Sequence, residues 1–425
     1  MDHIQAEAWL HSLPHRTRMP GVESERQLLV RLGNPEASLK FVHIVGTNGK
    51  GSTAAMLSSI LQKAGYKVGC TISPFVLEFR ERFQINGEMI PTDQLAAVTD
   101  QVRRAAEQME AETGELPCEF AAVTAVALVW FAQSGCDIVV LEAGIGGRLD
   151  ATNAVENTEA VCITHIGLDH TDMLGETTGA IAAEKCGVFR PGRPVICYPE
   201  QPQDAFDEIV VRAHDMGCEL VVPELEDLHP RRGRPLENRF DYGGYEVVLS
   251  LPGPHQQRNT MVVIETALAL WRRGWDISDD AILQGLYAVH FPARVEVVRR
   301  DPLIIIDGCH NPDGAAALAL TLRQAKLEGM ACIMGMMKDK DCTGVLRQLT
   351  DSFDHLYTVA PAGPRAMDPD QLADLAKPFF GRATVCDSLA DALELAWEDG
   401  FEGCVICGSL YLASEARAML VPAKN

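Results

Sequence analysis

Short apolar runs alternate with longer segments of helical periodicity along most of the chain. Continuous apolar runs predict buried strands, and apolar residues recurring every three or four positions predict amphipathic helices. The first strands are predicted at 41–45, 68–72, 137–141 and 160–164. Helices are predicted at 4–10, 25–32, 54–64, 92–112, 120–133 and 259–272, with a hairpin at 241–251. Buried runs separated by helices indicate a mostly parallel sheet that is covered on both faces.

A second alternating series follows a break at Phe291-Pro292-Ala293-Arg294. Its strands are predicted at 303–306, 331–334, 355–359 and 404–406, and its helices at 314–327 and 389–398. A chain of 425 residues is long enough for two or three domains. We therefore predict an α/β fold with one domain at 1–291 and a second at 298–425.

Composition indicates a globular protein, with 47% hydrophobic residues, and the formal net charge of −22 argues against nucleic-acid binding. The longest apolar run, 120–132, is too short to span a bilayer, and the N-terminus lacks a signal-peptide core. Thirteen scattered cysteines fit a reducing compartment. Two of them, in the run 404–407, are predicted in a buried strand. We expect a cytoplasmic monomer with no membrane partner.

The stretch Gly46 to Thr53 lies between a predicted strand and a predicted helix and reads GTNGKGST. Its glycines would let backbone N–H groups approach a polyphosphate, and the helix N-terminus adds a positive dipole end. Lys50 would reach the terminal phosphates, and the hydroxyl of Ser52 or Thr53 would face a Mg²⁺ ion. Ile44 occupies the position of the first Walker A glycine, and a plain turn into a helix is the alternative.

Glu142 directly follows the predicted strand 137–141 and precedes a glycine-rich loop. An acid at the carboxyl end of a parallel strand lies where α/β sheets bind ligands, and carboxylate oxygens suit Mg²⁺. We predict that Glu142 is a Mg²⁺ ligand; the alternative is a surface acid. An anionic substrate would need a local basic cluster on this acidic chain, for which Arg80, Arg82 and Arg148 are candidates.

Histidines and a lysine after the next strand have competing interpretations. His165 and His170 lie beyond the strand 160–164, but imidazole is an unusual partner for a hard ion, and a hydrogen-bonded histidine is the alternative. Lys185 lies near a helix end, where a lysine normally complements the helix dipole. A carbamate on Lys185 would instead convert a cation into a bidentate oxygen ligand.

Three polar residues of the second half lie at element boundaries. Asn259 begins a predicted helix, Arg294 lies in the break between domains, and Asp307 follows the strand 303–306. An acid just past a strand can accept ribose hydroxyls, and an arginine at a hinge can clamp phosphate bidentately. The alternatives are a helix cap for Asn259 and a turn at Asp307-Gly308.

Together these stretches resemble the folylpolyglutamate synthase/dihydrofolate synthase family of the Mur ligase superfamily. The matching motifs are GTNGKGST at 46–53, Ser73-Pro74, Glu81-Arg82, EAGIGGRLDATN at 142–153, ITHIGLDHTDMLG at 163–175, EKCG at 184–187, GPHQQRN at 253–259 and DGCHNP at 307–312. The resemblance implies a P-loop-type domain followed by a smaller Rossmann-like domain. It also implies an ADP-forming ligase that uses ATP and Mg²⁺ to add L-glutamate to a folate, and to dihydropteroate in a bifunctional enzyme.

The resemblance assigns roles to individual residues. The nucleotide contacts it implies are Thr47, Asn48, Gly49, Lys50, Gly51, Ser52, Thr53, Asn259, Arg294 and Asp307. The Mg²⁺ ligands it implies are Ser73, Glu142 and His170, to which the phosphate-loop motif adds Ser52. Lys185 matches the carbamylated lysine of the family, and His310 is a candidate base for the attacking amine. Arg82, Arg148 and Asp150 are predicted to bind substrate.

The sequence departs from the family pattern at several positions, including Ala143 and Ile145 in place of Val and Leu; most of these changes conserve bulk and leave the chemistry alone, and Phe75 is the exception. Phe75 replaces the usual His after Ser-Pro, which puts the usual contact of that loop with substrate or metal in question. Ala293 replaces a Gly, and Cys309 replaces an Ala. Rival interpretations are a Mur-type peptidoglycan precursor ligase, a nucleotide-binding regulator without catalysis, and a P-loop kinase.

Overall fold

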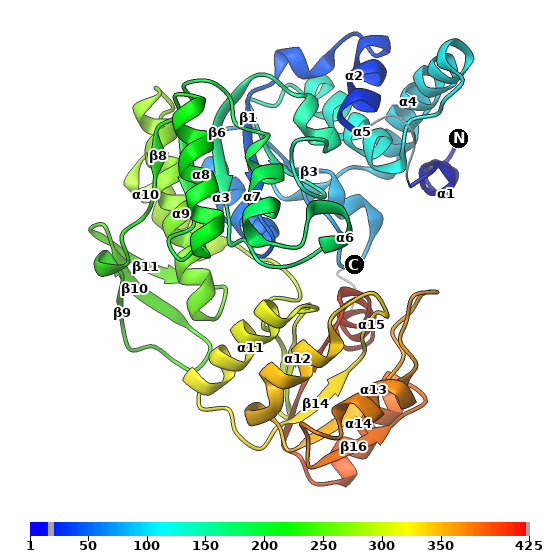
Figure 1. Ribbon diagram of the computed structural model, residues 1–425, viewed down its shortest axis with the longest axis vertical. Helices are drawn as coiled ribbons and strands as arrows, with labels where there is room; N and C mark the ends of the chain where they lie inside the picture. The colour runs from blue at the N-terminus through cyan, green and yellow to red at the C-terminus, as the bar shows by residue number, and fades with distance from the viewer. Residues whose placement is uncertain (16–20, 422–425) are drawn as a thin grey trace. The chain divides into compact units, whose positions relative to one another are not determined.

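The computed structural model describes residues 1–15 and 21–421 and divides into two compact units (Figure 1). Unit 1 comprises Met1–His229, Tyr242–Glu246 and Arg258–Val289. Unit 2 comprises Pro230–Asp241, Val247–Gln257 and His290–Asn425. The main boundary between the units, at Val289/His290, lies next to the break in the sequence pattern at 291–294. The assignment of Pro230–Asp241 and Val247–Gln257 to unit 2 was not predicted.

Unit 1 contains an eight-stranded sheet with the order β4-β3-β2-β5-β1-β6-β7-β8. The strands are β1 (Phe41–Val45), β2 (Val68–Thr71), β3 (Gln84–Ile85), β4 (Glu88–Met89), β5 (Ile138–Glu142), β6 (Thr158–Ile163), β7 (Val195–Cys197) and β8 (Leu220–Val221). Strands β2, β5, β1, β6, β7 and β8 are parallel, and β3 and β4 add an antiparallel edge. The predicted mostly parallel sheet is confirmed.

Helices cover both faces of this sheet, as its continuously buried strands require. The helices are α1 (His3–Ser12), α2 (Gly21–Arg31), α3 (Lys50–Lys63), α4 (Thr92–Thr113), α5 (Glu119–Gln133), α6 (Thr171–Leu174), α7 (Thr178–Cys186), α8 (Gln203–Asp215), α9 (Pro254–Arg272) and α10 (Asp279–Ala288). Alternate residues of β1, Phe41 and Val45, pack in cores that also contain α5 and α7, respectively. Cys162 of β6 points the other way, where its sulfur lies 3.0 Å from Thr266 Oγ1 of α9.

Unit 2 contains a six-stranded sheet with the order β12-β13-β17-β14-β15-β16, parallel except for β12. Its strands are β12 (Glu296–Arg300), β13 (Leu303–Ile306), β14 (Ala331–Met334), β15 (His355–Thr358), β16 (Arg382–Val385) and β17 (Gly403–Cys407). Its helices are α11 (Pro312–Gln324), α12 (Cys342–Leu349), α13 (Pro369–Ala376), α14 (Leu389–Glu398) and α15 (Leu410–Leu420). The predicted second α/β series is confirmed, and the run 404–407 is buried strand as expected.

A small sheet of order β11-β10-β9 completes the fold. Its strands are β9 (His229–Pro230), β10 (Asn238–Tyr242) and β11 (Tyr245–Leu249), which confirms the hairpin predicted around Gly243-Gly244. Helix starts were predicted less well than strands. Helix α9 begins at Pro254, so the helix start predicted at Asn259 is wrong, and the alternative of a helix cap at Asn259 is excluded. None of the helices in the described ranges has the length and hydropathy of a membrane span.

Candidate active site

Four parallel strands of unit 1 end at the same edge of the sheet. The register pairs Ile44 with Glu142, Val45 with Ile163 and Thr71 with Leu141. The segments that follow β1, β2, β5 and β6 therefore begin side by side. This carboxyl edge is where open α/β sheets bind ligands, and it carries the predicted phosphate loop, Ser73, Glu142 and His170.

The segment 46–49 joins β1 to α3 as a glycine-dependent loop. Gly46 and Gly49 have φ values of 151° and 93°. A Cβ at Gly46 would collide with Thr164, and one at Gly49 would lie 2.7 Å from Asn259 Oδ1. Gly49 caps α3, which begins at Lys50. The first N–H groups of a helix lack intrahelical acceptors and favour an anion, so this strand–loop–helix has the geometry of a phosphate site.

The loop is braced by the segment that follows β6. The N–H groups of Thr47 and Asn48 donate to the carbonyl oxygen of His165, over 2.8 and 3.2 Å. Thr47 Oγ1 also lies 3.0 Å from the carbonyl oxygen of Gly167. The backbone N–H groups of residues 47 and 48 are therefore engaged within the protein and hold the loop against the segment after β6. Sequence reasoning missed this role of His165, because a main-chain carbonyl gives no side-chain signal.

Two lysine side chains converge on the same loop. Lys50 Nζ lies 3.1 Å from the carbonyl oxygen of Gly46 and 3.3 Å from that of Thr47. Lys185, in the last turn of α7, donates to the Gly46 carbonyl oxygen over 2.7 Å and is 4% exposed. Burial, and then the charge of Lys50, lowers the pKa of Lys185 to about 7. A substantial fraction of Lys185 is therefore a neutral amine near neutral pH, which is the nucleophilic form.

Asn259 also belongs to the loop's surroundings. It lies inside α9, is 3% exposed, and its amide is the group that a side chain at Gly49 would strike. Its place inside α9 excludes the cap interpretation, and the nucleotide contact of Asn259 stays a prediction.

Ser73 and Glu142 are brought together from β2 and β5. The Ser73 N–H donates to Glu142 Oε2 over 3.0 Å, and the Glu142 N–H donates to Thr71 Oγ1 over 3.2 Å. Glu142 is 4% exposed. The Ser73 main chain and the Glu142 carboxylate are therefore in contact at the carboxyl edge of the sheet, and their role as Mg²⁺ ligands stays a prediction.

His170 lies on the segment after β6, two strands away from Glu142 in the sheet. It has a φ of 50°, and its imidazole is 4.0 Å from Asp169. The described residues contain no cluster of three or more His, Cys, Asp or Glu side chains arranged for a metal. Mg²⁺ does not need such a cluster, because it is commonly held by one or two carboxylates together with substrate phosphates and water. The oxygen groups of Ser73 and Glu142 fit that ion.

Arg82 links the Ser73 segment to an aromatic group. Its Nη1 donates to Ser73 Oγ over 2.9 Å. Its guanidinium carbon lies 5.3 Å from the centre of the Phe75 ring and 5.7 Å from that of Phe79. Phe75 therefore supports the arginine that holds Ser73, which gives this departure from the family pattern a local role.

Arg148 and Asp150 pin the glycine-rich loop after β5. Arg148 Nη2 lies 2.7 Å from Glu184 Oε1 of α7. Asp150 is buried, and its carboxylate accepts the N–H groups of Thr152 and Ile145 over 3.0 and 2.9 Å. Burial raises the pKa of Asp150, which these hydrogen bonds oppose. These contacts of Arg148 and Asp150, two of the three predicted substrate-binding residues, serve loop structure.

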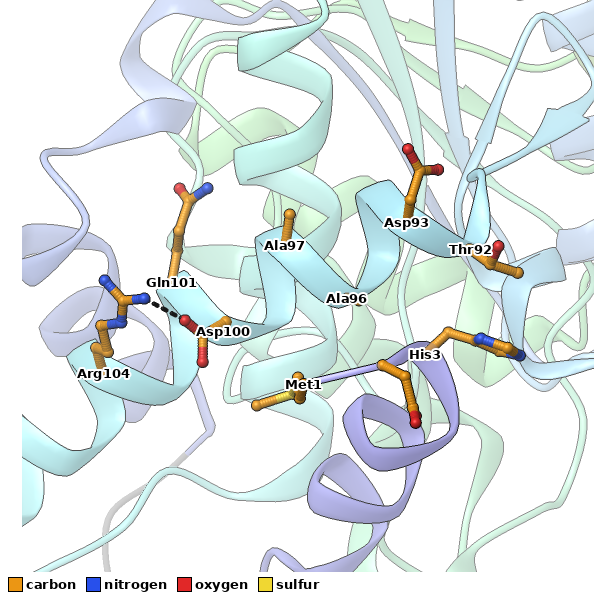
Figure 2. A pocket seen from close by; sticks show the side chains of 10 residues that line it. Met1, His3, Thr92, Asp93, Ala96, Ala97, Asp100, Gln101 and Arg104 are labelled. Atoms are coloured by element: carbon orange, nitrogen blue, oxygen red, sulfur yellow. Dashed lines mark hydrogen bonds and ion pairs between the residues drawn. The ribbon is translucent and has the colours of Figure 1, made fainter.

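Of two pockets in unit 1, one lies at the carboxyl edge of the sheet and the other does not. The first is lined by Ser73, Arg82 and Glu142 together with Phe120 and Thr152. The other lies along the start of α1 and the first turns of α4, and contains none of the predicted site residues (Figure 2). Its ionisable lining includes Asp100, which already forms an ion pair with Arg104. The first pocket is therefore the one that belongs to the candidate site.

Unit 2 gathers its own predicted site residues at the carboxyl end of β13. Asp307 is 7% exposed and accepts the N–H groups of Cys309 and Val295 over 2.8 and 2.9 Å. Burial raises the pKa of Asp307, and the charge of Arg294 opposes that shift. His310 Nδ1 lies 3.1 Å from the carbonyl oxygen of Gly308. A side chain at Gly308 would reach Arg294 Nη1 at 2.7 Å, so Arg294 lies against this turn.

Two family models match the chain. The Mur ligase middle domain matches residues 44–267, and the Mur ligase, glutamate ligase domain matches residues 293–409. Folylpolyglutamate synthase of Lacticaseibacillus casei is 34% identical, covering 100% of each chain. Dihydrofolate synthase/folylpolyglutamate synthase of Bacillus subtilis is 32% identical, covering 98% of each.

Solved structures agree with these sequence matches. Mycobacterium tuberculosis folylpolyglutamate synthase complexed with ADP and AMPPCP has a TM-score of 0.90 at 28% identity, covering 100% of both chains. Escherichia coli FolC in complex with DHPP and ADP has a TM-score of 0.85 at 30% identity, covering 99% of this chain and 97% of that one. The likeness extends over the full length of both units.

Proposed function

Because the chain belongs to the folylpolyglutamate synthase/dihydrofolate synthase family of Mur ligases, we propose that it joins L-glutamate to a folate and to dihydropteroate, using ATP and releasing ADP and phosphate. The observation that carries the proposal is the convergence at one sheet edge of the phosphate loop, Lys50, Lys185, Ser73 and Glu142. One relative of known structure is complexed with ADP and AMPPCP, and another with DHPP and ADP.

A carboxylate and an amine do not condense unaided in water, so the folate carboxylate must first be activated. Its oxygen attacks the γ-phosphorus of ATP, the bond to the β-phosphate oxygen breaks, and an acyl phosphate and ADP form. The glutamate amine then attacks the acyl carbon, and phosphate leaves as the amide bond forms. Catalysis of phosphoryl transfer is mainly positioning and neutralisation of charge.

The residues of unit 1 suit the first of these steps. The N–H groups of residues 49–52 would bind the phosphates, and Lys50 would leave the Gly46 carbonyl to neutralise the terminal phosphates. Asn259 would contact the nucleotide from α9. Mg²⁺ bound by Ser52, Ser73, Glu142 and His170 would supply charge neutralisation at the phosphates.

Lys185 has the environment that a carbamylated lysine needs. Only a neutral amine attacks carbon dioxide, forming an N–C bond and releasing a proton, and the pKa of Lys185 is lowered to about 7. The resulting carbamate would place an anionic oxygen group beside Lys50 and the loop. In unit 2, Arg294 would meet the transferring phosphoryl group, Asp307 would contact the nucleotide, and His310 is the candidate base for the glutamate amine.

The test is ADP release from the purified protein with ATP and Mg²⁺, measured with and without L-glutamate and with and without tetrahydrofolate or dihydropteroate. We expect turnover only when glutamate and one of the two pterin acids are both present, together with an amide product detected by mass spectrometry. ATP binding without turnover would favour a regulator. Phosphorylated substrate formed without glutamate would favour a kinase, and turnover with a nucleotide-sugar would favour a peptidoglycan precursor ligase.

A further inference from the structure

Arg294 is held on a strained stretch of backbone. The residues on either side of it, Ala293 and Val295, have φ values of 54° and 49°. L-residues rarely adopt this left-handed conformation, and a β-branched residue such as valine is a genuine outlier there. Such a conformation persists only when the surrounding structure holds it in place.

Two carboxylates hold the main chain on either side of Arg294. The Ala293 N–H donates to Glu296 Oε2 over 2.9 Å, and the Val295 N–H donates to Asp307 Oδ2 over 2.9 Å. Hydrogen bonds from N–H groups to carboxylates are among the stronger ones in proteins. Arg294 Nη1 in turn donates to the Ala293 carbonyl oxygen over 2.9 Å. The orientation of the guanidinium therefore depends on this backbone.

Glu296 is itself fixed by the last helix of the chain. Arg417 of α15 places its Nε 2.9 Å from Glu296 Oε1 and 3.1 Å from Oε2. The side chains of Arg417 and Glu296 are only 18% and 12% exposed, so solvent and salt screen this pair weakly. Arg417 thus reaches the Arg294 segment through one carboxylate and one peptide N–H.

We propose that Glu296 and Arg417 are positioning residues, which keep the Arg294 guanidinium in the orientation needed for phosphoryl transfer. The inference rests on the proposed function, in which Arg294 meets the transferring phosphoryl group. Glu296 and Arg417 act through the backbone of Ala293 and do not touch the nucleotide. Without them the segment leaves the left-handed conformation, and a displacement of about 1 Å costs up to about 10²-fold in rate.

The experiment measures kcat and the KM values for ATP and for L-glutamate in the full-length protein carrying Glu296→Ala, Arg417→Ala or Arg294→Ala. We expect Glu296→Ala and Arg417→Ala each to lower kcat about tenfold or more, with KM for L-glutamate unchanged. Lys377→Ala, which removes an exposed ion pair with Asp374 in the same unit, is the matched control and is expected to keep wild-type kcat.

Two further variants separate positioning from simple loss of fold. Glu296→Gln keeps an oxygen that can accept the Ala293 N–H, so it is expected to lose less than Glu296→Ala. Glycine populates left-handed conformations readily, so adding Ala293→Gly to Glu296→Ala is expected to restore most of the lost kcat. Circular dichroism and the melting temperature of each variant confirm that the folded protein is compared.

The outcomes distinguish this inference from the function on which it rests. A large loss in Arg294→Ala combined with wild-type kcat in Glu296→Ala and Arg417→Ala overturns the positioning role alone. Wild-type kcat in Arg294→Ala removes Arg294 from the proposed function and overturns the positioning role with it. A loss in Glu296→Ala that follows the melting temperature and that Ala293→Gly does not restore also overturns it.

Discussion

Lys185 and Glu25 are both buried ionisable residues of unit 1, and their surroundings differ in sign and in partners. Lys185 donates to the Gly46 carbonyl oxygen, and burial, together with the charge of Lys50, lowers its pKa to about 7. Both carboxylate oxygens of Glu25 are buried without a hydrogen-bond partner in the described chain. Burial, and then the charges of Glu36 and Asp150, raises the pKa of Glu25 well above its usual value.

The difference shows that burial alone does not make a functional group. Burial favours the neutral form of both side chains. At Lys185 the neutral form is a nucleophile that lies against the Gly46 carbonyl, at the sheet edge where we propose that ATP binds. At Glu25 the neutral form is a protonated acid inside α2, with other carboxylates as its charged neighbours. The surroundings of the neutral side chain, and not its burial, therefore indicate whether it has a functional role.

Removing the cation beside Lys185 is expected to have the largest effect. Lys50→Met should lower kcat for ADP release by about 10²- to 10³-fold, because a preorganised charge at the phosphates is lost. Lys63→Met, at the exposed far end of the same helix, is the matched control and should keep wild-type kcat. A Lys50→Met protein within tenfold of wild type would contradict the role of the loop.

Removing Lys185 itself should have the next largest effect. Lys185→Met should lower kcat by about 10- to 100-fold, as expected for a group that supports a metal or phosphate site. Carbon-13 NMR in labelled bicarbonate should show a carbamate signal in the wild type and none in the variant. An unlabelled wild type with full activity in carbon dioxide-free buffer would contradict carbamylation.

Glu25 should affect stability instead of rate. Glu25→Met should raise the free energy of unfolding by about 1–3 kcal/mol near neutral pH, because it removes a buried carboxyl group that has no hydrogen-bond partner among residues 1–15 and 21–421. Glu23→Met, on the exposed face of the same helix, is the matched control and should change stability by less than about 0.5 kcal/mol. A destabilised Glu25→Met protein would reveal a partner for this carboxyl.

The pH dependence of stability should have opposite signs at the two sites. The pKa of Glu25 is higher in the folded state than its ordinary value of 4.5. The protonated carboxyl therefore contributes fully to stability below pH 4.5, and this contribution is lost as the pH rises through the pKa of the folded state. Lys185 has a pKa of about 7 when folded and 10.5 otherwise, so stability should rise between those two pH values. The free energy of unfolding, measured with urea from pH 5 to 10, should lose its fall with pH in Glu25→Met and its rise with pH in Lys185→Met.

The smallest expected effect comes from relieving backbone strain at Ala293. Ala293→Gly should relieve a left-handed alanine, worth about 1 kcal/mol, while increasing the conformational entropy of the unfolded chain. The net gain in unfolding free energy should be about 0.5 kcal/mol, measured by urea unfolding, with kcat unchanged. A clear loss of stability would mean that the alanine methyl group packs favourably enough to outweigh its strain.

Strong local patterns predicted most of the fold. The apolar run 41–45 is β1, and the motif after it folds as strand, loop and helix. Helix starts were harder, because α9 begins with residues such as Gln256 and Gln257, which are polar but buried. Apolar periodicity therefore placed the start of this helix too late, at Asn259.

The parts of the site that were not predicted depend on contacts between distant residues. The brace from His165 to the loop 46–49 uses a main-chain carbonyl, and the partner of Glu296 is Arg417 of α15, 121 residues away in the sequence. The burial of Glu25 could not be predicted from the sequence, because a glutamate in a helix is usually exposed to solvent. Single-sequence patterns describe a residue's own neighbours and carry no information about such pairings.

The most direct test of the central claim is a crystal structure of the protein with AMPPCP and Mg²⁺. We predict that the β- and γ-phosphates lie within hydrogen-bond distance of the N–H groups of residues 49–52 and of Lys50 Nζ. The Mg²⁺ ion should be coordinated by Ser73 and Glu142. A nucleotide bound away from this loop, or a metal ion that contacts neither Ser73 nor Glu142, would contradict the account.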